Sequence, residues 1–98
     1  MNKAPEKVVV RALANEMQRI RVQVPTSKWF LFGSVTTSRR PVRDVDFLVV
    51  CKDTIDCVTI RSELDSICAQ FPVHLLIMSE SEESEVNFIK DQRAIEIT

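Results

Sequence analysis

Two aspartates, Asp44 and Asp46, stand at the entrance of an otherwise apolar stretch that continues to Cys51. Side chains two residues apart on a strand project to the same side, about 7 Å apart at the backbone. Their oxygens can lie on one divalent cation, and carboxylates suit Mg²⁺ or Mn²⁺. Such an ion usually completes its shell with water and substrate phosphates. The pair therefore predicts a metal site for a phosphate-bearing substrate, and the alternative is a solvated strand start.

The only glycine of the chain, Gly33, directly follows the apolar run 29–32. Glycine allows the backbone to approach a phosphate closely, and the N–H groups that open the next turn can point at it. The Ser34 hydroxyl can donate a further hydrogen bond, and Arg43 can supply positive charge. We interpret Gly33, Ser34 and Arg43 as a triphosphate-binding loop. A plain turn glycine within a solvated basic loop is the alternative.

Helical and strand periodicities predict one small domain spanning residues 1–98, of mixed α/β (α+β) class. The expected order is helix, strand, strand, helix, strand and a short C-terminal element. The expected helices span about Ala4–Val22 and Thr54–Gln70, and the expected strands span Lys28–Phe32, Asp44–Cys51 and Val73–Met78. Ser79–Glu85 is interpreted as an acidic loop, followed by a short helix around Ser84–Asp91 and an edge strand over Ala94–Ile97.

Composition excludes several functions. The formal net charge of −1 argues against nucleic acid as a bulk ligand, and the apolar runs are too short to span a membrane. The N-terminal residues lack the apolar segment of a signal peptide. Three cysteines without metal-ligand spacing favour buried, reduced thiols in a cytoplasmic protein, so we expect a cytoplasmic location.

The combined pattern resembles the signature of the DNA polymerase beta-type nucleotidyltransferase superfamily, and its minimal members in particular. The likeness is carried by Gly33-Ser34, nine intervening residues, and then Asp44-Val-Asp46 before an apolar strand. It implies a nucleotidyltransferase-like fold, with a small mixed sheet under packed helices. It also implies that Gly33 and Ser34 bind the triphosphate of an NTP, with ATP as first candidate, and that Asp44 and Asp46 bind Mg²⁺ or Mn²⁺.

One position departs from the family pattern. Active members usually carry a third carboxylate on the following strand, where this chain has Val73-His74-Leu75. His74 has three interpretations: a structural histidine with satisfied hydrogen bonds, a substitute metal ligand, or a general base. We count it among the catalytic candidates with Asp44 and Asp46.

Two functions follow as expectations. The first is metal-dependent transfer of a nucleoside monophosphate from an NTP to a hydroxyl acceptor. The second is a catalytically impaired, nucleotidyltransferase-like binding or regulatory module, similar to an antitoxin, that acts through a partner. The resemblance implies a helical protein as that partner, and a homodimer is the other assembly we expect. A purely structural domain would leave Asp44 and Asp46 without a reason.

Overall fold

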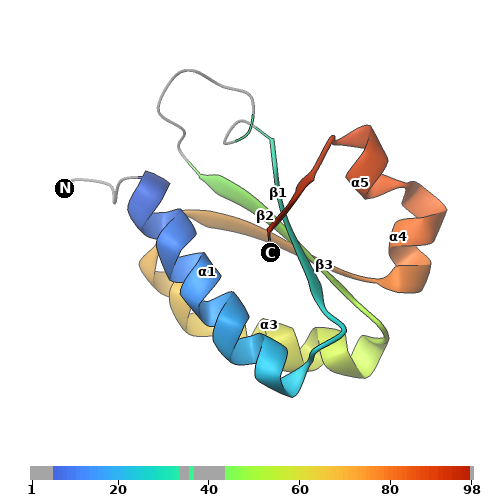
Figure 1. Cartoon of the computed structure of the whole chain (residues 1–98), viewed down its shortest axis with the longest axis horizontal. Helices are drawn as coiled ribbons and strands as arrows, with labels where there is room; N and C mark the ends of the chain where they lie inside the picture. Colours follow the sequence, from blue (N-terminus) through green and yellow to red (C-terminus); the bar gives the residue numbers. More distant parts are fainter. Residues whose placement is uncertain (1–5, 34–35, 37–43, 98) are drawn as a thin grey trace.

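The computed structural model describes residues 6–33, 36 and 44–97. Within these residues, helices and a small sheet form one layered unit (Figure 1). The elements in chain order are α1 (Glu6–Gln23), β1 (Lys28–Phe32), β2 (Val45–Cys51), α3 (Thr54–Gln70), β3 (Val73–Ser79), α4 (Glu80–Val86), α5 (Phe88–Asp91) and β4 (Ile95–Ile97). The fold is therefore mixed α+β, as the sequence predicted.

The sheet has the strand order β3-β2-β1-β4. β1 runs antiparallel to both β2 and β4, whereas β2 and β3 are parallel. The parallel pair is joined by α3, as a crossover connection requires. β2 is an interior strand, which explains why its residues after Asp46 are apolar on both faces.

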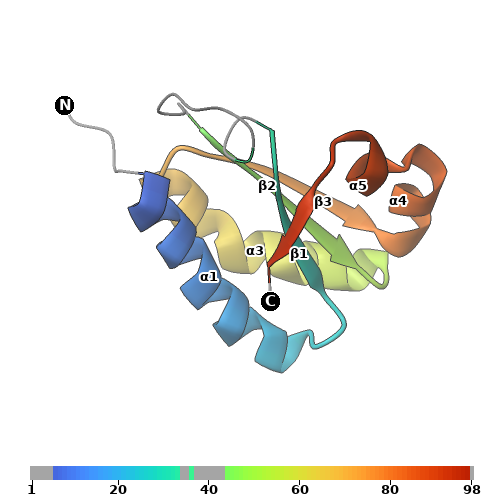
Figure 2. The same ribbon diagram turned by 45° about the horizontal axis from the view of Figure 1, so that its top comes forward.

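The main core lies between the sheet and the two long helices. α1 and α3 lie together against one face of the sheet (Figures 1 and 2). Trp29 and Phe47 are fully buried there, with ring centroids 5.4 Å apart. The Trp29 indole N–H donates to the Ser27 hydroxyl, so the one polar atom of this side chain is satisfied within the core. α1 contributes its predicted apolar stripe of Val9, Leu13, Met17 and Ile20.

A second, smaller core covers the opposite face of the sheet. Its buried members are Phe30, Phe32, Leu48 and Val50. The C-terminal segment packs on them through Phe88, Ile89 and Ala94. The strand alternation predicted for residues 44–51 is thus confirmed for the strand itself, because Leu48 and Val50 face one core while Phe47 and Val49 face the other. Asp46 shares the parity of Leu48 and therefore lies on the side away from α1 and α3.

Several predicted bounds agree with the structure. β1 and α3 have the predicted ends, and the Asp53 carboxylate caps α3 by accepting from the Asp56 N–H at 2.9 Å. β2 begins one residue later than predicted, at Val45. α1 reaches Gln23, and its predicted start at Ala4 lies outside the described residues. The predicted edge strand is confirmed as β4, which pairs with β1.

The prediction of a loop at Ser79–Glu85 is wrong. α4 begins at Glu80, and Ser79 caps it in a reciprocal capping box. The Glu82 N–H donates to the Ser79 hydroxyl at 3.1 Å, and the Ser79 N–H donates to the Glu82 carboxylate at 2.9 Å. Ser-x-x-Glu is a known helix-start pattern, and the acidic composition of this segment concealed it. No helix in the described part of the chain is long and apolar enough to cross a membrane.

Candidate functional site

Gly33 and Asp46 lie against each other where β1 ends and β2 begins. Phe32 is the register partner of Asp46, so the residue after Phe32 falls beside the Asp46 side chain. Gly33 has φ +72°, and a Cβ added there would overlap the Asp46 Oδ2 and lie 3.1 Å from its Cγ. Two features therefore require glycine at this position: the positive φ angle, and the carboxylate that a Cβ would overlap. The group that approaches Gly33 in this structure is an aspartate.

Asp46 is also joined to His74 on the next strand. The two residues are register partners of the parallel β2–β3 pair, and His74 Nδ1 lies 3.0 Å from Asp46 Oδ1. An ionised carboxylate can only accept, so Nδ1 carries the hydrogen and donates it. In the neutral ring this leaves Nε2 with its lone pair. The His74 side chain is 60% exposed and that of Asp46 is 23% exposed, so solvent and ligands can reach the histidine.

The Phe32 ring lies beside His74, and the Phe88 ring packs against Phe32. The Phe32 ring lies 6.4 Å from the His74 ring and makes an edge-to-face contact with Phe88 at 4.9 Å. Phe88 belongs to α5, far along the chain, and the sequence did not indicate its contribution. A local sequence pattern cannot predict a contact between residues as far apart in the chain as Phe32 and Phe88.

Thr36 is a further residue that sequence reasoning did not single out. Its hydroxyl donates to the Gly33 carbonyl at 2.8 Å, and its backbone N–H donates to the same oxygen at 3.1 Å. These bonds tie Thr36 to the residue that follows β1. Ser34 and Arg43, the other candidates for binding phosphate, lie outside the described residues.

The two aspartates of the sequence pattern differ in their surroundings. Asp46 is held on β2, whereas Asp44 is an exposed bend residue before the strand begins. Among residues 6–33, 36 and 44–97, no group of three or more His, Cys, Asp or Glu side chains is placed to hold a metal ion. The donors present therefore do not form a metal site built from protein ligands alone. Mg²⁺ held by one or two carboxylates takes its other ligands from water and phosphate, so a magnesium site here would depend on the substrate.

Comparisons of the chain with protein-family models, curated proteins and solved structures yield no match. Function must then be inferred from the site itself. Its defined part combines a conformationally special glycine, a partly buried carboxylate and an exposed histidine oriented by that carboxylate. A carboxylate is a ligand type that Mg²⁺ accepts, and an imidazole is a group type that serves as a general base.

Proposed function

We propose that this chain is a nucleotidyltransferase-like domain that transfers a nucleoside monophosphate from an NTP to a hydroxyl acceptor. Gly33 and Ser34 would bind the triphosphate, with Arg43 adding positive charge. Asp44 and Asp46 would hold Mg²⁺ or Mn²⁺. ATP is the first candidate for the NTP. The proposal includes a nucleotidyltransferase-like arrangement of the mixed sheet.

One observation carries this proposal more than any other. Sheet register brings Asp46 against Gly33 on one side and against His74 on the other, although these residues are 13 and 28 positions away in the chain. Three residues that the sequence indicated as site candidates thus lie together at one end of the sheet. An acid, a histidine and the only glycine of the sequence therefore share one place in the fold.

The protein groups would divide the work as follows. A bound metal would neutralise phosphate charge and polarise the α-phosphate. The Gly33 turn and Ser34 would orient the triphosphate through backbone and hydroxyl donors. Asp46 would orient the His74 ring through Nδ1, so that Nε2 is directed to accept the proton of the attacking hydroxyl. Each of these tasks is within reach of the groups at the site.

The direct test is label transfer from α-labelled ATP in the presence of Mn²⁺ and candidate acceptors, including proteins and RNA. We expect transfer with the wild type and its loss in Asp46→Asn. Asp56→Asn is the matched control, because Asp56 lies in the first turn of α3, near the opposite end of β2. Absence of label with any acceptor, or equal activity of both variants, would contradict the proposal.

A second candidate is a nucleotidyltransferase-like module without full activity that acts through a partner protein. The observation that favours it is the hydrogen bond itself, because His74 occupies Asp46 Oδ1 where a carboxylate is expected from the family pattern. A histidine there lowers the negative charge available for metal.

His74→Asp tests this second candidate. If the site is an impaired one, the added carboxylate should confer or strengthen metal-dependent ATP binding, measured by calorimetry. His74→Asn is the matched control, because asparagine has nearly the same shape as aspartate but carries no charge. Unchanged binding in His74→Asp would remove the basis for an impaired site.

A further inference from the structure

β3 forms one edge of the sheet, and its own sequence carries few of the features that usually protect an edge strand. Among the described strands it pairs only with β2. Its seven residues, Val-His-Leu-Leu-Ile-Met-Ser, include no proline, lysine or glutamate. Natural edge strands are usually short, charged or interrupted, because unpaired backbone groups invite another strand. β4 at the opposite edge follows this rule, with three residues and a central Glu96.

The hydrogen-bond ladder identifies which backbone groups of β3 point outward. The Val45 N–H donates to the Pro72 carbonyl at 2.9 Å, and Val45 is in register with Val73. In a parallel ladder, this hydrogen bond and this register mean that the even-numbered residues of β3 direct their N–H and C=O groups toward β2. Leu75 and Ile77 therefore direct their N–H and C=O groups away from the sheet. At the end of the strand, the Ser79 N–H is already bonded to Glu82.

This outward pattern is self-complementary. In an antiparallel pairing centred on Leu76, Leu75 lies opposite Ile77 of the partner subunit, and the reverse holds by symmetry. Both residues of each pair direct their N–H and C=O groups outward, so each pair exchanges two hydrogen bonds. The two pairs related by the two-fold axis thus form four backbone hydrogen bonds between the subunits. The backbone hydrogen bonds between β3 and β2 all remain intact.

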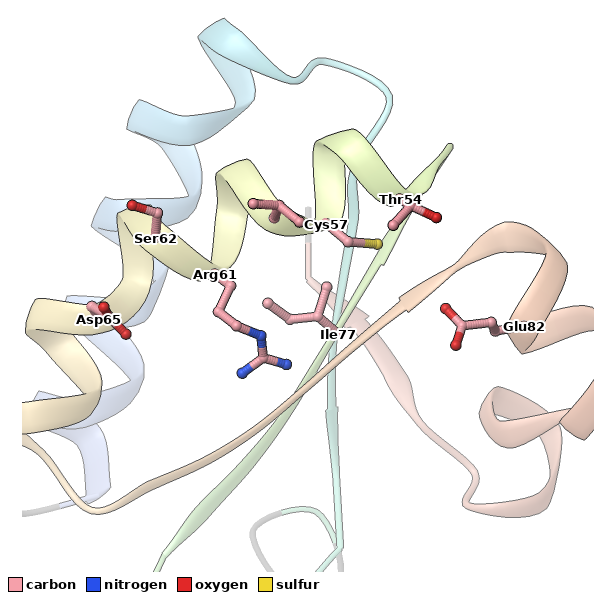
Figure 3. Close-up of a pocket in the computed structure, with 8 residues that line it drawn as sticks. Thr54, Cys57, Arg61, Ser62, Asp65, Ile77 and Glu82 are labelled. Atoms are coloured by element: carbon pink, nitrogen blue, oxygen red, sulfur yellow. The ribbon is translucent and has the colours of Figure 1, made fainter.

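The surface beside the β3 edge carries charges that are complementary to those of a second copy. A groove of about 400 Å³ runs beside β3, with Ile77 on one wall and the α3 residues Arg61, Ser62 and Asp65 on another (Figure 3). Arg61 and Asp65 carry opposite charges one helical turn apart on the groove side of α3. Glu63, between them in sequence, instead accepts from Arg19 of α1.

The position of these charges along α3 fits the same two-fold axis. Leu76 lies about 10 Å along β3 from Val73. The same length corresponds to about seven residues of helix, counted back from Gln70. Taking α3 as antiparallel to β3, with Gln70 level with Val73, the axis passes α3 near residue 63, midway between Arg61 and Asp65. Two antiparallel copies of α3 would then bring each Arg61 toward Asp65 of the partner subunit.

We infer that this chain forms a two-fold homodimer in which β3 of each copy pairs edge to edge and the two sheets become one. A second copy is the occupant that matches both the outward backbone pattern and the alternating charges. The pairing would also cover Val58, an α3 residue of the groove that is 64% exposed. The inference is independent of the proposed function.

Ile77→Pro tests the strand pairing, because proline removes an outward N–H and keeps every bond to β2. Ile77→Ala is the matched control, since it loses side-chain packing but retains the N–H. Sedimentation should give twice the 11.2 kDa chain mass for the wild type and for Ile77→Ala. It should give the single-chain mass for Ile77→Pro. A wild type that stays monomeric at all concentrations, or a dimeric folded Ile77→Pro, would overturn the inference.

Charge reversal at the surface provides a test that does not depend on changing the strand. Arg61→Glu and Asp65→Lys should each weaken the homodimer, since each places like charges across the axis. Mixed together they should form a heterodimer, in which both cross-axis pairs are again opposite in sign. Sedimentation of each variant alone and of the equimolar mixture measures this. No preference for the mixed pair would contradict the assigned register.

Discussion

At the scale of single residues, Gly33 and Asp46 depend on each other. The backbone angle of Gly33 and the carboxylate beside it both exclude a side chain at this position. The sequence indicated that the glycine served a close approach, and it placed Gly33, Asp46 and His74 among the site candidates. It could not show that Asp46 itself makes the approach, because that contact depends on strand register between distant segments.

Gly33→Ala should lower the free energy of unfolding by about 1–3 kcal/mol, since a left-handed conformation is costly for any residue with a Cβ. Displacement of the Asp46 carboxylate adds to this cost. Urea unfolding of the purified variant measures the loss. A change near zero would contradict the described geometry.

The matched experiment repeats the change in an Asp46→Ala background. Without the carboxylate, only the backbone cost of Gly33→Ala should remain, so the two substitutions should be clearly non-additive. Additive effects would mean that the Gly33 Cβ and the Asp46 side chain do not meet.

At the scale of elements, the periodicity of apolar residues predicted helix and strand bounds correctly, whereas the acidic composition of residues 79–85 led to a wrong prediction of a loop. Lys28–Phe32 and Thr54–Gln70 were predicted with the observed bounds, because apolar residues at strand or helix spacing also form the cores. The start of α4 was missed, and the predicted helix around Ser84–Asp91 covers only its last three residues and α5. None of the α4 residues is buried, and only the cap indicates where this helix begins. Strand order and direction are set by long-range pairing, which no local pattern encodes.

Ser79→Ala should destabilise the chain by about 1 kcal/mol, because it removes the hydroxyl that accepts the Glu82 N–H at the start of α4. Thermal unfolding followed by circular dichroism measures the effect. Ser81→Ala is the control, since Ser81 is exposed and lies just inside the same helix. Equal effects of the two substitutions would show that the cap contributes nothing particular.

At the scale of the whole molecule, the cysteines link stability to alkaline pH. Burial raises the pKa of Cys51 well above its ordinary value, and burial also raises the pKa of Cys57 and of Cys68. Above the ordinary thiol pKa of 9.0, the unfolded chain loses these protons while the folded chain keeps them. Folding stability is therefore complete below that pH and falls as the pH rises through it.

The free energy of unfolding should decline above about pH 9, by at most about 1.4 kcal/mol per pH unit from Cys51. The sequence contains no tyrosine, which removes one competing titration in this range. Urea unfolding at pH 8 and pH 10 measures the decline, and Cys51→Ala should make it shallower. An identical slope in that variant would contradict the assignment to Cys51.

The central claim is that one end of the sheet binds a metal–nucleotide complex. The most direct measurement is the nuclear magnetic resonance spectrum of the labelled protein during titration with Mn²⁺ and ATP, since manganese broadens nearby signals. We predict that the amide signals of Gly33, Asp44, Asp46 and His74 broaden first, and that Asp46→Asn abolishes this. Signals that stay sharp there, or that broaden first at another surface, would contradict the claim.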